Sequence, residues 1–199
     1  ALRDVTVSPD GDFVYTLEGK QGATEVAVYR RDPATGALSD RRAYSAGWGG
    51  HNGRLQFSPN GEYLVLSAGV YVYRVDQRTG ALNEVQHLGG EGVAPVFGPN
   101  GDYLYVPVSL EKIYTYKQTA SGRFEQIDVL NRTELNTGSY DLDYLRSIAV
   151  SNDGETLFVG SGDVVALSRD PSTGVIGRNI IAAHPGRNIS PKRMLMHPD

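Results

Sequence analysis

The stretch Ser8-Pro9-Asp10-Gly11 recurs along the chain and sets its organisation. It returns at Ser58-Pro59-Asn60-Gly61, Gly98-Pro99-Asn100-Gly101, Ser151-Asn152-Asp153-Gly154 and, cut short, His197-Pro198-Asp199. The proline position repeats at intervals of 50, 40, 53 and 46 residues. In such a turn, proline fixes the first corner, Asp or Asn tolerates the second, and glycine supplies a positive φ. A period of this length indicates a repeat architecture.

Runs of β-branched and aromatic residues flank each turn, as expected for buried strands. In the first repeat, strands are predicted at 4–7, 13–17 and 25–29, and the equivalent runs recur in the next three repeats. A second turn signature, D-x-x-T-G, follows the third strand at 32–36, 76–80 and 170–174, and a degenerate form ends at Gly122. A more polar fourth strand then closes each unit, for instance at 82–87 and 124–129.

Four short strands per repeat predict an all-β fold, a β-propeller of four-stranded antiparallel blades. The repeats run approximately over 1–49, 50–90, 91–143, 144–190 and, in part, 191–199. We expect residues 1–199 to be a single propeller domain or a propeller fragment. Repeat units bury their apolar faces against neighbours. The alternatives are therefore an arc of a larger ring, a ring made by two copies, or a small closed ring.

Composition limits the partners and the compartment. The net charge of −4 is too mild to indicate a nucleic-acid partner, and no apolar run approaches the length of a membrane-spanning helix. The chain has no cysteine, and its histidines lack metal-ligand spacing. We therefore expect no metal site and no cofactor. Because the chain begins with Ala1 and shows no signal pattern, we expect a processed or excised product.

The repeat also resembles a known family. The pattern V-S-P-D-G-x-F/Y-V/L-Y, followed by V-x-V-Y-R-x-D-P-x-T-G-A-L, resembles lactonase-type seven-bladed propellers with YVTN-type repeats. Residues 139–151 are similar to a loop that precedes blades in propeller arrays of bacterial surface and haemolysin-like proteins. The second resemblance implies an extracellular or periplasmic location, although a cytoplasmic one is open.

The lactonase resemblance also implies where chemistry takes place. Members of that family are thought to act from the central channel, with His, Arg and Glu side chains near the starts of the first strands. The stretch Gly49-Gly50-His51-Asn52-Gly53-Arg54 resembles the family's G-x-H segment. Ser190-Pro191-Lys192-Arg193 resembles a late P-R-x segment, with Lys192 in the place of its arginine.

Cationic residues recur six positions before the proline slot. That position holds Arg3, Gly53, Val93, Arg146 and Lys192. If it lines the channel mouth, the cations Arg3, Arg146 and Lys192 form a ring suited to a carboxylate or phosphate ligand. The alternative is that long basic side chains pack their stems on the blade and keep their charged heads in water.

His51 is the strongest single catalytic candidate. Lactone hydrolysis requires a general base for water and a donor for the developing oxyanion. His51 with Arg54 or Arg146 has those groups. Trp48 lies in the same connection as His51, and Glu91 lies at the equivalent position between the next two repeats; both are ligand-binding candidates. The alternative is that His51 is a loop residue bonded to backbone and Glu91 a solvated carboxylate.

Three functions remain open. The first, which we favour, is a module of an exported bacterial protein that binds a small anionic or sugar ligand or a protein. The second is a lactone hydrolase or related cyclase that acts in the channel. The third is a structural repeat of a larger array. The recurring motifs form turns and strands and say almost nothing about chemistry, so whether the chain is an enzyme stays open at this point.

Overall fold

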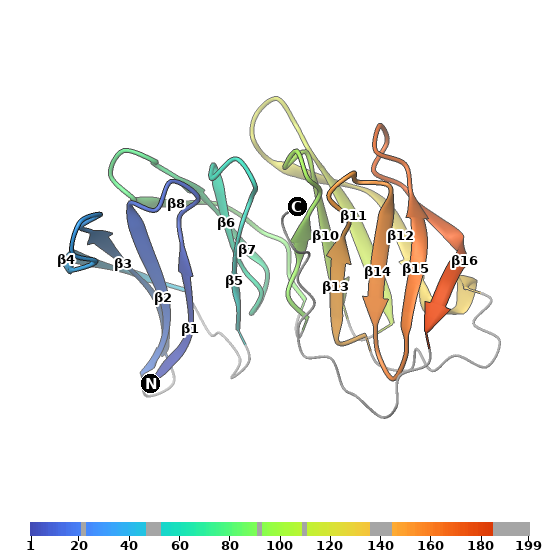
Figure 1. Cartoon of the computed structure of the whole chain (residues 1–199), viewed down its shortest axis with the longest axis horizontal. Helices are drawn as coiled ribbons and strands as arrows, with labels where there is room; N and C mark the ends of the chain where they lie inside the picture. The colour runs from blue at the N-terminus through green and yellow to red at the C-terminus, as the bar shows by residue number, and fades with distance from the viewer. Residues whose placement is uncertain (21–22, 47–52, 91–92, 109–110, 136–144, 185–199) are drawn as a thin grey trace. The chain divides into compact units, whose positions relative to one another are not determined.

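The computed structural model describes residues 1–20, 23–46, 53–90, 93–108, 111–135 and 145–184. It confirms the all-β fold of four-stranded antiparallel blades (Figure 1). Each sheet has its strands in chain order, so every strand pairs with its sequence neighbour in a meander. The strands predicted around the first turn are β1 (Leu2–Val7) and β2 (Phe13–Lys20). The fifth repeat, which begins at 191, lies outside the described residues.

Each of the four sheets lies within one of the four complete repeats. Blade 1 continues with β3 (Ala23–Arg31) and β4 (Leu38–Ser45). Blade 2 consists of β5 (Leu55–Phe57), β6 (Tyr63–Leu66), β7 (Tyr71–Val75) and β8 (Leu82–His87). Blade 3 consists of β9 (Val96–Phe97), β10 (Tyr103–Val108), β11 (Lys112–Gln118) and β12 (Phe124–Asn131), followed by a 3-10 turn at Arg132–Glu134. Blade 4 consists of β13 (Ser147–Val150), β14 (Thr156–Gly160), β15 (Val164–Arg169) and β16 (Ile176–His184).

The S-P-D-G turn is held by its own side chains. The Phe13 amide donates to Ser8 Oγ over 2.9 Å, and the Asp12 amide donates to Asp10 Oδ1 over 3.0 Å. The glycine takes the positive φ that the turn needs, +81° at Gly11 and +73° to +80° at its three counterparts. The turn is therefore encoded locally, which is why its pattern recurs along the chain.

The D-x-x-T-G turn is capped by its aspartate, as the sequence predicts. Asp170 Oδ1 accepts the backbone N–H groups of Ser172 and Thr173 at 2.8 and 3.2 Å, and the Ser172 hydroxyl at 2.7 Å. These hydrogen bonds lower the pKa of Asp170 to about 2, and the bond from the Ser172 hydroxyl has the largest effect. Asp32 and Asp76 cap their turns in the same way. In blade 3, Thr119 takes the place of the aspartate and bonds Arg123.

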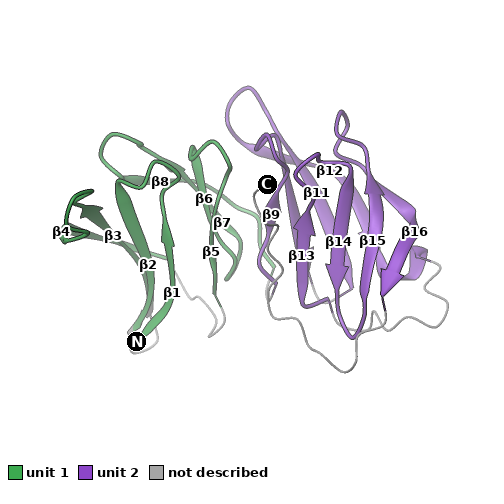
Figure 2. Cartoon of the chain, in the orientation of Figure 1, with its two compact units in different colours: residues 1–91 green, residues 92–199 purple. Residues whose placement is uncertain are grey.

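The blades form two compact units, Ala1–Glu91 and Gly92–Asp199 (Figure 2). Unit 1 contains blades 1 and 2, and unit 2 contains blades 3 and 4. Within each unit, the innermost strands of the two blades are in contact, β1 with β5 and β9 with β13. We call the side of a blade that faces the next blade of its unit the forward face, and the opposite side the backward face.

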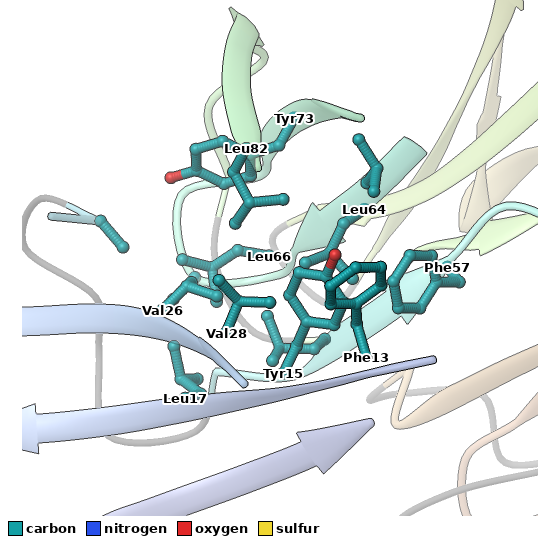
Figure 3. Close-up of a cluster of buried hydrophobic side chains, with 14 residues drawn as sticks. Phe13, Tyr15, Leu17, Val26, Val28, Phe57, Leu64, Leu66, Tyr73 and Leu82 are labelled. Carbon is teal, nitrogen blue, oxygen red and sulfur yellow. The ribbon is translucent and has the colours of Figure 1, made fainter. Parts of the chain in front are cut away.

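The core of unit 1 lies between its two blades (Figure 3). The forward face of blade 1 contributes Phe13, Tyr15 and Leu17 from β2, and the Tyr15 ring meets Phe57 edge-on at 5.2 Å. The backward face of blade 2 contributes a set of apolar residues that includes Leu55, Phe57, Leu64 and Leu66. Alternate residues of each strand face this core, which is the period expected of a strand with one face buried against a neighbouring blade.

Unit 2 repeats this arrangement. Tyr103, Tyr105 and Ile113 of blade 3 pack against a set from blade 4 that includes Ile148, Val150, Leu157 and Val159. At the outer side, Arg178 of β16 reaches back to β12 and binds Asp128 through two hydrogen bonds of 2.7 and 2.8 Å. The guanidinium lowers the pKa of that carboxyl through these hydrogen bonds. A bidentate pair of this kind fixes the blades' outer strands relative to each other.

The outermost strand of blade 1 is almost wholly exposed, as predicted for a polar edge strand. In the described part of the chain, no helix has the length and hydrophobicity to cross a membrane.

Candidate functional site

The starts of the inner strands bring two charged residues of neighbouring blades together. Asp4 lies in β1, and Arg54 comes immediately before β5. Their side chains form an ion pair, with 3.5 Å between Arg54 Nη1 and Asp4 Oδ1. The other carboxylate oxygen of Asp4 accepts the Leu55 amide at 2.7 Å. Asp4 therefore joins β1 to β5 through both of its oxygens.

The backbone before β5 is positioned by close packing. A Cβ on Gly53 would lie 2.7 Å from Leu17 Cδ2, so only glycine allows this approach to the core of unit 1. The Arg54 amide donates to Ser67 Oγ over 2.8 Å, and the Ser67 amide donates to the Arg54 carbonyl oxygen over 2.9 Å. These contacts fix the backbone of Arg54, and its side chain is free to pair with Asp4.

The ion pair is asymmetric in its exposure. The Asp4 side chain is 11% exposed, whereas that of Arg54 is 43% exposed. A guanidinium has five N–H donors, and Asp4 uses only one edge of it. The arrangement therefore presents an oriented cation to solvent at the start of an inner strand. Such a group suits a carboxylate, a phosphate or a developing oxyanion.

The predicted cationic position lies six residues before the proline, and Gly53 holds it in blade 2. Its other described members differ from one another. Arg146 is exposed, and its backbone amide donates to the Gly160 carbonyl oxygen over 2.8 Å. Arg3 is half-buried, with its side chain lying over Gly19 of the same blade. Val93 is buried. Arg3 lies in unit 1, Arg146 lies in unit 2 and Lys192 lies outside the described residues, so the cationic ring stays a prediction.

Four sequence candidates lie outside the described residues, namely Trp48, His51, Glu91 and Lys192. Their predicted roles remain predictions. Among the residues that are described, no group of three or more His, Cys, Asp or Glu side chains is placed to hold a metal ion.

Sequence reasoning missed Asp4. The sequence holds a signal for it, because Asp4 and Arg54 each stand five residues before the proline of their turn. Equivalent positions of successive blades lie side by side on neighbouring inner strands. Opposite charges at one repeat position therefore predict an ion pair between blades.

A small hollow of about 140 Å³ lies elsewhere in unit 1, between the turns that follow β1 and β5. Its walls include Pro9, Phe13, Asn60 and Gly61. The one carboxylate in its lining, that of Asp10, already accepts bonds from the Ser8 hydroxyl and the Asp12 amide. The hollow is therefore part of the turn structure and offers no oriented charge comparable to Arg54.

Comparison with known proteins identifies the repeats. Residues 2–96 match the family described as "Lactonase, 7-bladed beta-propeller". Among the curated proteins, none matches the chain. Two similar solved structures are each described as a "putative 6-phosphogluconolactonase". That from Bacteroides fragilis has a TM-score of 0.74 at 19% identity, and that from Bacteroides uniformis has 0.71 at 16%. Sqt1 from Chaetomium thermophilum has 0.65 at 21% identity.

The matches cover most of this chain but about half of the other proteins. The alignments span 96% and 93% of the chain, against 56% and 55% of the two Bacteroides proteins, and 92% against 48% for Sqt1. Identities this low show the fold alone. Together with the family match, which includes Asp4 and Arg54, they confirm the resemblance of the repeats. Residues 2–96 therefore carry the repeats of a lactonase-type β-propeller, and the chain as a whole shares the propeller fold.

Proposed function

We propose that this chain forms part of a propeller-type lactone hydrolase, with Arg54 as its anion-binding group. The observation that supports this most directly is the Asp4–Arg54 ion pair, which holds a half-exposed guanidinium at the start of an inner strand. The family match includes both residues, and two similar structures are described as a "putative 6-phosphogluconolactonase". The proposed substrate class is accordingly a sugar lactone with an anionic substituent.

The chemistry assigns a role to each group. Water adds to the lactone carbonyl carbon, the carbonyl oxygen becomes an oxyanion, and the ring C–O bond then breaks. The proton lost by the water ends on the alkoxide that leaves, and the products are a carboxylate and an alcohol. Arg54 stabilises the negative charge that develops, or binds the anionic substituent. Asp4 is a positioning residue, since it orients the guanidinium through its second bond to Leu55. His51 remains the sequence-based prediction for the general base.

Substitution of Arg54 in the full-length protein tests this function. We expect hydrolysis of 6-phosphogluconolactone above the spontaneous rate, and Arg54→Ala to lower kcat/KM by about 10²–10³-fold, the usual effect of losing an oxyanion donor. Arg54→Lys keeps the charge but loses the fork that faces Asp4, so it should restore part of the activity. Arg78→Ala is the control, because Arg78 is an exposed cation in the second turn of blade 2.

The same geometry also suits the alternative, a module of an exported protein that binds an anionic sugar without turnover. A single oriented guanidinium binds a carboxylate or phosphate without any general base. Binding of the lactone or its acid that depends on Arg54, with no hydrolysis above the spontaneous rate, would favour this alternative. Neither binding nor hydrolysis in the unsubstituted protein would exclude both.

A further inference from the structure

Contacts between blades 3 and 4 show what the backward face of a blade recognises. Tyr103 and Tyr105, at alternate positions of β10, point from the forward face of blade 3. The Tyr105 hydroxyl donates to the Gly174 carbonyl oxygen over 2.7 Å, and the Tyr103 hydroxyl donates to that of Ser172 over 2.6 Å. Both acceptors belong to the D-x-x-T-G turn of blade 4. Both hydroxyls of the Tyr-x-Tyr pair therefore bind to the same turn.

An arginine of the receiving blade completes this recognition. Arg169, the last residue of β15, is 5% exposed. Its Nη1 donates to the Gly154 carbonyl oxygen over 2.5 Å, and its Nε donates to the Tyr105 hydroxyl. The guanidinium carbon lies 5.3 and 5.4 Å from the ring centres of Tyr103 and Tyr105. Contacts from both tyrosines thus help to compensate the burial of this cation.

Blade 2 receives a different pair. The residue that corresponds to Arg169 is Val75, and blade 1 presents Phe13 and Tyr15. The Tyr15 hydroxyl again donates to the glycine of the turn, here the Gly80 carbonyl oxygen at 2.9 Å. The first aromatic residue, Phe13, packs against Gly80 without a hydroxyl. The residue at the end of the third strand thus differs between the blade that receives a Tyr-x-Tyr pair and the blade that receives a Phe-x-Tyr pair.

The backward face of blade 1 repeats the arginine version. Arg31 ends β3 as Arg169 ends β15, and its Nη1 donates to the Gly11 carbonyl oxygen over 3.2 Å. Ala34 and Gly36 stand in the places of Ser172 and Gly174. Gly36 has the same left-handed φ of +73°, but nothing lies within 4 Å of where its Cβ would be. Gly80 and Gly174 are buried, whereas Gly36 is exposed.

The inner strand of blade 1 is uncovered as well. Val5 and Val7 are 53% and 48% exposed. The residues at the same positions are 3% and 8% exposed in blade 2, at Leu55 and Phe57, and 5% and 7% in blade 4, at Ile148 and Val150. An apolar strip beside an arginine and two carbonyl acceptors therefore has no covering group among the described residues.

We propose that this backward face docks a further blade of the same polypeptide, outside residues 1–199, whose second strand carries a Tyr-x-Tyr pair. The four described blades do not supply a spare pair. Phe13/Tyr15 and Tyr103/Tyr105 are already engaged, and the other two blades hold Tyr63/Val65 and Thr156/Phe158 at these positions. The matched family has seven blades, which is why we assign the partner to the same polypeptide and not to a second copy.

Photo-crosslinking in the full-length protein tests the proposal. The probe is p-benzoylphenylalanine in place of Ala34, which is exposed and corresponds to the Tyr103 acceptor Ser172. We expect an intramolecular crosslink to a peptide with Tyr-x-Tyr at the start of a blade's second strand. Mixed light and heavy isotope-labelled chains separate crosslinks within a chain from those between copies. A crosslink to another copy, to the strand that holds Thr156 and Phe158, or to a peptide without Tyr-x-Tyr would overturn the proposal.

A second variant tests the role of Arg31. Arg31→Val gives the backward face of blade 1 a valine at the end of its third strand, as Val75 does in blade 2. We expect the crosslink yield at position 34 to fall several-fold. Arg42→Val is the matched control, because Arg42 faces the other way and bonds the Thr79 carbonyl oxygen of blade 2. An equal yield from Arg31→Val and the unsubstituted protein would show that the arginine does not select the partner.

Discussion

The Tyr105 hydroxyl donates a 2.7 Å hydrogen bond to the carbonyl oxygen of Gly174, 69 residues further along the chain. The Tyr15 hydroxyl makes the equivalent bond to Gly80, 65 residues away. Both tyrosines are completely buried. Each bond therefore connects two separate sheets. It joins a tyrosine of one blade to the D-x-x-T-G turn of the next blade.

Removal of these hydroxyls should destabilise each unit. Tyr15→Phe leaves the Gly80 carbonyl oxygen without this partner, and we expect a loss of about 1–2 kcal/mol in the free energy of unfolding. Tyr105→Phe should cost more, about 2–3 kcal/mol, because the buried Arg169 also loses an acceptor. Urea denaturation measures both. The control is Tyr44→Phe, since Tyr44 packs against the unit 1 core only in part. Equal losses in all three variants would contradict a specific role for the two bonds.

The glycines of the second turn should differ in their tolerance of alanine. Gly36 and Gly80 share a φ of +73° and +72°, but an added Cβ at Gly80 would lie 2.6 Å from Phe13. We expect Gly36→Ala to cost about 1–2 kcal/mol from the left-handed conformation alone. Gly80→Ala should cost at least twice as much, because it also displaces a buried aromatic ring. If the two variants have the same melting temperature, the contact of Phe13 with Gly80 does not contribute to stability.

The aspartate caps predict how stability depends on pH. The folded-state pKa of Asp170 is about 2, below the unfolded value of 3.8, so its contribution is complete above pH 3.8 and is lost as the pH falls through about 2. Carboxyl carbon NMR should give an Asp170 midpoint near 2. Ser172→Ala removes the largest cause and should move the midpoint upward. A midpoint near 4 in the unsubstituted protein would mean that the cap does not form in solution.

The fold could be predicted from the sequence because its signals are local. The S-P-D-G and D-x-x-T-G turns are closed by side chains within five residues and by glycines at positive φ, so each can be read from a short window. Alternation of apolar residues located the strands. The prediction of polar fourth strands was also correct, because an exposed edge strand has a polar composition.

The site was harder to predict because it depends on contacts between blades. The Asp4–Arg54 pair forms across neighbouring inner strands. Arg54 is a candidate from the sequence alone, but Asp4 does not stand out in its own repeat. The bonds of Tyr15 and Tyr105 have the same origin, since their acceptors are backbone carbonyl oxygens of another blade. Backbone acceptors leave no signature in a side-chain pattern. Residue types therefore predict the blades, and a comparison of repeat positions predicts the ion pair between them, but neither predicts the bonds to backbone acceptors.

The most direct test of the central claim is a calorimetric titration of the full-length protein with 6-phosphogluconate, the product of the proposed reaction. We predict binding that weakens at least tenfold in Arg54→Ala and is unchanged in Arg78→Ala, because Arg54 is oriented by a carboxylate at the start of an inner strand, whereas Arg78 is an exposed residue of a turn. Asp4→Asn should weaken binding by less, since it loosens the guanidinium without removing it. Equal affinity in the unsubstituted protein and Arg54→Ala would contradict the assignment of Arg54 to the functional site.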